Sequence, residues 1–278
     1  MNKFGGDWTK DKIEILVEYA KAYLTIMNKH PYWKLLYFDG FAGTGFIEKE
    51  KAEDVKITVG ASRRIVEIDK PRSFNQYYFV EKIHANCELL SKNTKEQFIG
   101  KEIHVVEEDC NVKLQALVKY LQSKEGENYK ILAYIDPCGM QLRWESIACL
   151  KGLPIDMWIL VPTGMGVNRL LKNNGQISEK WEEKLEVFLG LTREQIRQEF
   201  YRQEDTLFGV EERKEYDASN KSAQLYHSRL KEIFRYVTNP YELCNSTNSI
   251  MYHFFLASNN KTAIKIGNDI LKLHNKKK

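Results

Sequence analysis

Residues 34–45 read Lys-Leu-Leu-Tyr-Phe-Asp-Gly-Phe-Ala-Gly-Thr-Gly, an apolar run that ends in an acid and a glycine-rich turn. A short apolar run bounded by turn residues is typical of a strand that is buried on both faces. Glycine adopts positive φ readily and, because it has no Cβ, lets the backbone approach a ligand closely. The stretch therefore predicts a strand over Lys34–Asp39 and then a tight turn, which is either a ligand-binding loop or a structural bend.

Strand-like and helical patterns alternate after this turn. The further predicted strands are Gln76–Glu81, Glu102–Val106, Lys130–Asp136 and Asp156–Val161, and the helices between them are Ala85–Phe98, Val112–Gln122 and Trp144–Leu150. Such alternation is typical of a parallel sheet with helices on both faces. We therefore expect an α/β fold with a mostly parallel, twisted sheet, and we expect the charged stretch from Ile47 to Lys56 to be a loop.

The remaining segments extend this sheet within one domain over 1–278. An amphipathic pattern over 9–28 predicts an N-terminal helix that Thr9 caps. The predicted cofactor half spans 34–162, a helical insertion about 164–235, and closing strands and a helix 236–278. In the closing part, Ser249–Ala257 is expected to pair with Tyr241–Cys244 as a hairpin at the sheet edge.

Composition narrows the class of protein. The 278 residues are 43% hydrophobic and 12% aromatic, which excludes a disordered or collagen-like chain. The net charge of +4 permits an anionic partner without requiring one. The five cysteines form no CxxC pair, and no apolar run resembles a signal peptide or a membrane span, so we predict a cytoplasmic protein without membrane association.

Acids stand at or just beyond the ends of successive predicted strands, at Asp39, Glu81, Asp109 and Asp136. The carboxyl ends of parallel strands line one crevice, in which ligands bind, so we expect these side chains to meet there. Glu81 suits the two hydroxyls of a ribose, or it complements a helix dipole. Asp109 could accept a hydrogen bond from an adenine amino group, or it caps the following helix.

The turn departs from the pattern of dinucleotide-binding sites. It is not Gly-x-Gly-x-x-Gly, and Glu81 follows Asp39 after about twice the roughly 20 residues usual in such a unit. The residues still fit a cofactor that contains a nucleoside, but they include no clear loop for binding a pyrophosphate. S-adenosylmethionine is the natural candidate. No metal is required.

Residues 135–139, Ile-Asp-Pro-Cys-Gly, follow the fourth predicted strand. Proline holds the backbone rigidly, so the Asp136 carboxylate and the next carbonyls could accept hydrogen bonds from an amine that is being methylated. Positioning and desolvation can supply most of the catalysis of methyl transfer. The alternative is an Asp-Pro turn that only ends the strand.

Together these motifs resemble the cofactor and catalytic motifs of class I S-adenosylmethionine-dependent methyltransferases. More narrowly, Gly6-Asp7-Trp8-Thr9-Lys10 with the helix that contains Lys12, Phe38 to Gly45, and Val161-Pro162 followed by Asn168-Arg169 resemble the three-Cys-motif partner protein family (TcmP). The resemblance implies a Rossmann-like class I methyltransferase fold and the following sites. Cofactor-binding residues would be Asp39, Gly40, Phe41, Ala42, Gly43, Thr44 and Gly45 for the methionine part, Glu81 and Lys82 for the ribose, and Asp109 and Cys110 for the adenine; Asp136, Pro137, Cys138 and Gly139 would hold the methyl acceptor.

The last motif is similar to the Asp-Pro-Phe-Gly of tRNA guanine-N2 methyltransferases and the Asp-Pro-Pro-Tyr of amino methyltransferases. This similarity implies an exocyclic amine of a nucleic acid base, in tRNA or DNA, as the acceptor. Cys138 stands where those families place an aromatic ring or a proline, and Trp144 or Tyr134 is a candidate to stack on the base instead. Alternatives are a protein or small-molecule acceptor, or a non-catalytic partner of a three-Cys-motif protein.

Two further features leave alternatives open. Residues 162–166 form either a lid over the acceptor site or a connecting loop. Basic residues of the insertion either contact phosphates or, because acids are interleaved with them, form a solvated helical face. They are Arg169, Lys172, Arg193, Arg197, Arg202, Arg213, Lys214 and Arg229.

Overall fold

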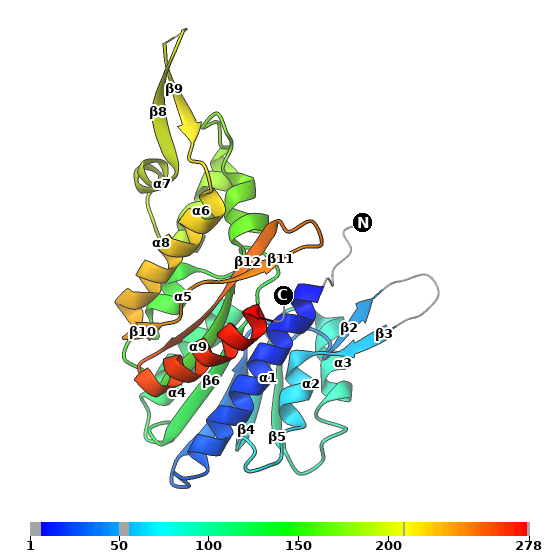
Figure 1. Ribbon diagram of the computed structural model, residues 1–278. Coiled ribbons are helices and arrows are strands. Elements are labelled where there is room, and N and C mark those ends of the chain that lie inside the picture. The colour runs from blue at the N-terminus through cyan, green and yellow to red at the C-terminus, as the bar shows by residue number, and fades with distance from the viewer. Residues whose placement is uncertain (1–6, 50–55, 208, 277–278) are drawn as a thin grey trace.

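The computed structural model describes residues 7–49, 56–207 and 209–276 (Figure 1). Its centre is an eight-stranded sheet of order β10-β12-β7-β6-β1-β4-β5, in which β11 also pairs with β12. The parallel strands are β1 (Lys34–Asp39), β4 (Gln76–Glu81), β5 (Glu102–Glu107), β6 (Tyr129–Ile135) and β7 (Ile155–Val161). Strand β12 (Ile250–Ser258) runs antiparallel to β7 and also to the short edge strands β10 (Tyr236–Val237) and β11 (Tyr241–Cys244).

This strand order confirms the predicted fold. From β1 the chain adds β4 and β5 on one side and then crosses over to add β6 and β7 on the other side. The reversal between β1 and β6 creates the switch point at which open α/β sheets bind ligands. With the antiparallel β12 inserted beside β7, the order is that of a Rossmann-like, class I methyltransferase fold.

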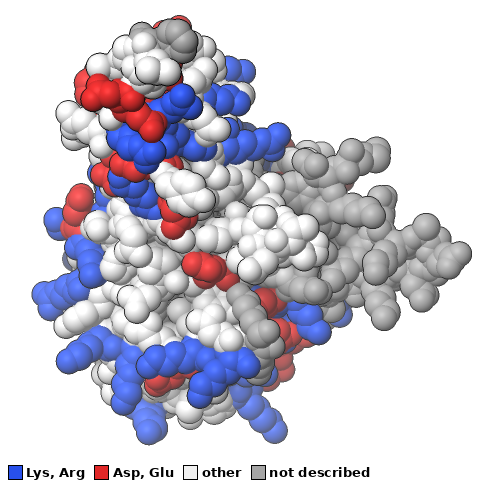
Figure 2. Space-filling model, turned by 45° about the horizontal axis from the view of Figure 1, so that its top comes forward, with Lys and Arg blue, Asp and Glu red and all other residues white. Residues whose placement is uncertain are grey.

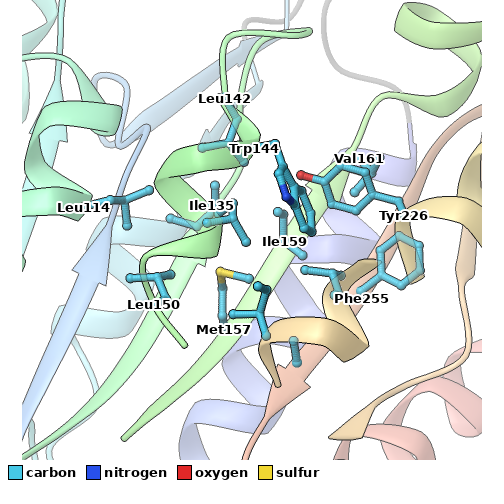
Figure 3. Packing of buried hydrophobic residues seen from close by; sticks show 14 of the residues in the cluster. Leu114, Ile135, Leu142, Trp144, Leu150, Met157, Ile159, Val161, Tyr226 and Phe255 are labelled. Atoms are coloured by element: carbon cyan, nitrogen blue, oxygen red, sulfur yellow. The ribbon is translucent and has the colours of Figure 1, made fainter. Parts of the chain in front are cut away.

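Two hydrophobic clusters cover the two faces of the sheet. One cluster packs helices α1 (Asp7–Met27), α2 (Ala61–Val66), α3 (His84–Asn93) and α9 (Lys261–Asn275) against the sheet. The other packs α4 (Cys110–Leu121), α5 (Trp144–Ala148), α6 (Glu179–Leu189), α7 (Arg193–Phe200) and α8 (Ala218–Ile233) (Figure 3). Successive residues of a strand point to opposite faces, so Leu36 and Phe38 of β1 enter the second cluster whereas Leu35 and Tyr37 enter the first.

Three local predictions were wrong. The stretch expected to be a loop contains β2 (Phe46–Lys49) paired antiparallel with β3 (Lys56–Val59), while 50–55 lie outside the described residues. The insertion contains a hairpin of β8 (Tyr201–Thr206) and β9 (Gly209–Lys214), which projects from the molecule (Figure 1). Thr9 lies inside α1 instead of capping it, and no partner for its buried hydroxyl is found among the described residues.

The missed hairpin has a physical explanation. Its strands, Tyr-Arg-Gln-Glu-Asp-Thr and Gly-Val-Glu-Glu-Arg-Lys, are mostly exposed on both faces, so they lack the apolar alternation of a half-buried strand. The two strands are instead joined by pairs of opposite charges, such as Arg213 and Glu204, whose charged atoms lie 3.8 Å apart. No helix in the described part of the chain is long and apolar enough to span a membrane.

Candidate functional site

Asp39 supports the glycine turn from beneath. Its side chain is 1% exposed, and its carboxylate accepts hydrogen bonds from the backbone N of Phe41 at 3.3 Å and from Ser62 Oγ at 3.0 Å. Burial raises the pKa of Asp39 to about 7, although these hydrogen bonds oppose the rise. Asp39 therefore shapes the turn from within the core, and Ser62 is a contributor that the motif alone did not reveal.

The glycine turn joins the two strands that flank β1. Gly40 N donates to the carbonyl of Tyr134 in β6 at 2.9 Å, and Ala42 N donates to that of Val80 in β4 at 3.0 Å. A Cβ on Gly40 would lie 2.5 Å from the Sγ of Cys110, so glycine is required for close packing there. Cys110 is itself buried, and the structure places its thiol under the turn rather than on the surface of the crevice.

The end of the turn is held by side chains from β4 and α3. Gly43 and Gly45 adopt positive φ of 62° and 79°, and Asn93 Nδ2 donates to the carbonyl of Thr44 at 2.8 Å. Glu81 Oε2 accepts from Gly43 N at 3.0 Å, while its Oε1 accepts from Ile83 N at 2.8 Å. Since each carboxylate oxygen keeps a further lone pair, Glu81 is oriented and still able to accept hydroxyl hydrogens.

Asp109 is the N-cap of α4. Its Oδ1 accepts from the backbone N and the Nδ2 of Asn111, each at 2.8 Å, and Lys82 Nζ donates to its Oδ2 at 3.0 Å. Partial burial would raise the pKa of Asp109, but the hydrogen bonds from Lys82 and Asn111 outweigh it and hold the pKa below its usual value. The capping interpretation is thus confirmed, and any contact with an adenine would be an additional role.

Asp136 lies just beyond β6, beside the glycine turn. Its Oδ2 accepts from Lys12 Nζ at 2.5 Å and from the Tyr134 hydroxyl at 2.9 Å. Within the described ranges no donor contacts Oδ1, so this oxygen is available to a ligand. The Lys12 pair spans 124 positions of sequence.

Lys12 was not among the predicted site residues, although the sequence contains a signal for it. It lies one and two turns before Leu16 and Tyr19 on a buried side of α1, and it is only 6% exposed. A lysine on a buried helix face is almost always paired. That pattern predicts an acidic partner without saying which one.

Residues 136–139, which the sequence predicts to hold the methyl acceptor, are called the acceptor loop. In this loop Pro137 is buried and Cys138 is exposed, and Gly139 has a φ of 88°. Partial burial and the charge of Asp136 raise the pKa of the Cys138 thiol, so the thiol is a poor nucleophile at neutral pH. Neither alternative ring is available for stacking. Trp144 packs against Tyr226 in the core, and Tyr134 is fully buried with its hydroxyl on Asp136.

A six-residue π-helix, η1 (Thr163–Asn168), forms a packed wall beside this loop. A Cβ on Gly166 would lie 2.9 Å from Met140, and one on Gly164 would lie 1.9 Å from the carbonyl oxygen of Ile250 in β12. Residues 163–166 are therefore wedged between the acceptor loop and β12, which does not fit a mobile lid.

His253 of β12 connects η1 to helix α8 of the insertion through two hydrogen bonds. Its Nδ1 lies 2.7 Å from Thr163 Oγ1 and its Nε2 lies 3.1 Å from Asn220 Oδ1 of α8. Burial lowers the pKa of His253 to about 4, so the imidazole is neutral at physiological pH. One tautomer satisfies both contacts, because Nε2–H donates to Asn220 while Nδ1 accepts from the Thr163 hydroxyl.

The basic residues of the insertion fall into two groups. Five form ion pairs with glutamates: Arg193, Arg197, Arg202, Arg213 and Arg229. Three have no carboxylate partner among the described residues: Arg169, Lys172 and Lys214. Lys214 Nζ instead donates to the side-chain and backbone oxygens of Asn168 and to the carbonyl of Leu171.

Lys214 lines a cavity of about 480 Å³ between η1 and the base of the hairpin. Burial, and secondarily the charge of Lys172, lowers the pKa of Lys214. The upper part of the molecule in Figure 2 carries basic and acidic side chains side by side, the middle of this face is largely uncharged, and Lys and Arg side chains gather along its lower edge. The cations without acidic partners thus lie at the base of the insertion, next to η1.

No protein-family model matches this chain, and no curated protein matches it. Solved structures that resemble it include a Legionella pneumophila protein of family DUF519, with 14% identity, coverage of 94% of this chain and 92% of that chain, and a TM-score of 0.49. A complex of Trm1 from Pyrococcus horikoshii with S-adenosyl-L-methionine has 10% identity and a TM-score of 0.44; the match covers 95% of this chain but only 57% of that one. A conserved hypothetical protein from Streptococcus pyogenes has 14% identity, coverage of 68% and 89%, and a TM-score of 0.32. The assignment of the fold rests on the strand order.

Proposed function

We propose that this protein transfers the methyl group of S-adenosylmethionine to an exocyclic amine of a nucleic acid base. The observation that carries the proposal is Asp136, a carboxylate fixed through Oδ2 and open at Oδ1, at the switch point of the sheet. Beside it stands a second oriented carboxylate, Glu81, at the end of β4. Together they offer one site for a ribose and another for an amine at the same edge of the sheet.

The residues of the cofactor side fit a nucleoside-bearing cofactor. A Cβ on Gly43 would point into open space, so the backbone here borders room for a ligand. Glu81 would accept hydrogen bonds from the ribose hydroxyls, and the glycine turn would hold the methionine part with its backbone. When bound, S-adenosylmethionine supplies an electrophilic methyl group.

On the acceptor side, Asp136 Oδ1 accepts a hydrogen bond from the amine and thereby orients the nitrogen lone pair towards the cofactor side. Lys12 and Tyr134 keep the carboxylate from rotating, because both hold the other oxygen. Such positioning converts an encounter into an aligned reaction and supplies a large part of the rate enhancement.

A nucleic acid acceptor is favoured by Arg169, Lys172 and Lys214. Cations without acidic partners keep a charge that no carboxylate compensates and that can neutralise a phosphate, whereas the charge of those paired with glutamates is already compensated. Arg169 and Lys172 follow η1 in the chain, and Lys214 lines the 480 Å³ cavity and donates to the carbonyl of Asn168 in η1, which supports a basic surface near η1.

Calorimetry and methyl transfer test the proposal in two steps. S-adenosylmethionine should bind the wild type, and Glu81→Ala should abolish binding; Glu102→Ala, an exposed acid at the opposite end of β5, is the matched control and should bind normally. Tritium transfer to tRNA, DNA and lysate protein then identifies the acceptor. Asp136→Asn should abolish transfer and spare cofactor binding.

Each result separates the alternatives. A wild type that does not bind S-adenosylmethionine would leave the non-catalytic partner of a three-Cys-motif protein as the better proposal. Transfer to protein alone would replace the nucleic acid acceptor. For a nucleic acid, the variant Arg169→Ala/Lys172→Ala/Lys214→Ala should flatten the slope of log affinity against log salt by about 2 to 3, roughly 1 for each lost phosphate contact.

A further inference from the structure

Among the described residues, the ring of Trp8 lies near Asp136 and is partly open to solvent. Trp8, in the first turns of α1, is partly exposed, and its ring lies 4.9 Å from Lys12 Nζ. The same ammonium lies 2.5 Å from Asp136 Oδ2. Lys12 therefore contacts both the Trp8 ring and the carboxylate that orients the amine.

Tyr252 supports this ring from β12. The centroids of the Tyr252 and Trp8 rings are 4.9 Å apart, with an angle of 33° between their planes. Tyr252 is only 3% exposed, so the contact holds Trp8 against a rigid part of the sheet. Burial raises the pKa of Tyr252, and the charges of Asp136 and Cys138 add to the rise, which agrees with a hydroxyl close to the acceptor loop.

A planar acceptor needs such a ring because a flipped base loses its stacking on neighbouring bases and regains it on an aromatic side chain. The acceptor loop itself offers only Cys138, and the rings of Trp144 and Tyr134 are buried. Lys12 adds a positive charge beside the ring, which keeps the carboxylate and the stacking surface at a constant separation.

We propose that Trp8 is the stacking surface for the base that carries the acceptor amine, and that Tyr252 and Lys12 are positioning residues that hold the ring beside Asp136. This inference rests on the proposed function, since it concerns the same acceptor site. The aromatic contact with the base is thereby assigned to helix α1 instead of the acceptor loop.

Intrinsic fluorescence with a mixed-sequence single-stranded oligonucleotide tests the contact without requiring turnover. Stacking quenches tryptophan, so the oligonucleotide should quench the wild type, and Trp8→Phe should lose most of the change. Trp33→Phe is the matched control, because Trp33 also lies against a lysine, Lys130 at 4.0 Å, but borders a cavity at the opposite edge of the sheet. It should keep the quenching of the wild type.

Methyl transfer to the acceptor found above gives the second measurement. Trp8→Leu should raise the acceptor KM about 10- to 100-fold, in keeping with the loss of one stacked base, and Trp8→Phe should restore most of it. The Kd for S-adenosylmethionine should stay unchanged in both variants, which a merely structural role would not predict.

The two proposals fail in different ways. If Trp8→Phe is quenched as strongly as the wild type, or Trp8→Leu keeps the wild-type KM, the stacking role is wrong even though transfer occurs. If transfer is absent but quenching by the oligonucleotide depends on Trp8, the stacking contact stands and the proposed catalysis fails. Absence of both transfer and quenching overturns both.

Discussion

Glu81 and Asp136 follow strands on either side of β1, yet different parts of the chain hold them. Glu81 accepts from the backbone N–H groups of Gly43 and Ile83, so it depends on the backbone conformation of the turn, including the positive φ of Gly43. Asp136 depends on the side chains of Lys12 and Tyr134, and Lys12 comes from a helix at the other end of the sequence. The proposed cofactor side is therefore built from local backbone geometry, whereas the proposed acceptor side depends on individual distant side chains.

The largest effect is expected from Lys12→Met. Removing one partner of a buried ion pair leaves the other charge uncompensated and costs about 3–5 kcal/mol of unfolding free energy. Urea unfolding measures the loss. The matched control is Arg64→Met on the neighbouring ion pair of α1, Arg64 with Glu14 at 2.5 Å, whose side chains are more exposed and should contribute below about 1 kcal/mol.

A double variant separates the ion pair from simple packing. Lys12→Met/Asp136→Asn removes both charges, so it should be more stable than Lys12→Met alone. Equal losses in the two variants would show that the lysine acts through its aliphatic stem and that the acceptor side is not held by charge.

Asp39 predicts a pH dependence on the cofactor side. Its pKa is raised to about 7 in the folded protein, so between about pH 4 and 7 the folded state binds more protons than the unfolded state. Asp39 therefore lowers stability as pH rises through this window, by about 4 kcal/mol at most. Unfolding curves from pH 4 to 8 should show that the stability of Asp39→Asn, relative to the wild type, increases with pH; a constant difference would contradict the raised pKa.

His253 predicts the opposite slope on the acceptor side. Its pKa is lowered to about 4, so between about pH 4 and 6.5 the unfolded state binds more protons, and stability falls as pH falls. The lowered pKa of His253 reduces the unfolding free energy at low pH by about 3 kcal/mol at most. His253→Asn should lose this dependence, with the same unfolding measurements as the readout. Because Asp39 and His253 oppose each other in the wild type, only the differences between variant and wild type reveal them.

The smallest effect is expected at the turn itself. Gly43→Ala forces an alanine into positive φ in open space, at a cost of about 1 kcal/mol, and displaces the N–H that holds Glu81. Gly152→Ala carries the same kind of strain, with a φ of 80° and no neighbour within 4 Å, but lies away from the crevice. Both should lose similar stability in urea unfolding, and calorimetry should find weaker S-adenosylmethionine binding only for Gly43→Ala.

The sequence predicted the sheet well where strands are buried. Gln76–Glu81 and Tyr241–Cys244 have the predicted bounds, because apolar runs between turns leave little choice of structure. It failed at β8–β9, whose strands are rich in charged residues and lack an apolar pattern, and at β2–β3, whose strands have only four residues each. Charged sequences gain their strand structure from cross-strand pairing, which no single segment reveals.

The sequence by itself determined which acids stand at the ends of the parallel strands and that they share one edge, because strand ends and topology follow from local pattern and connection rules. It did not determine what those acids contact. The pairing of Asp136 with Lys12, and the approach of Trp8 to Tyr252, arise only when α1 packs on the sheet beside β12. Such contacts depend on the packing of whole elements, and the acceptor side of the site was therefore decided by the tertiary structure.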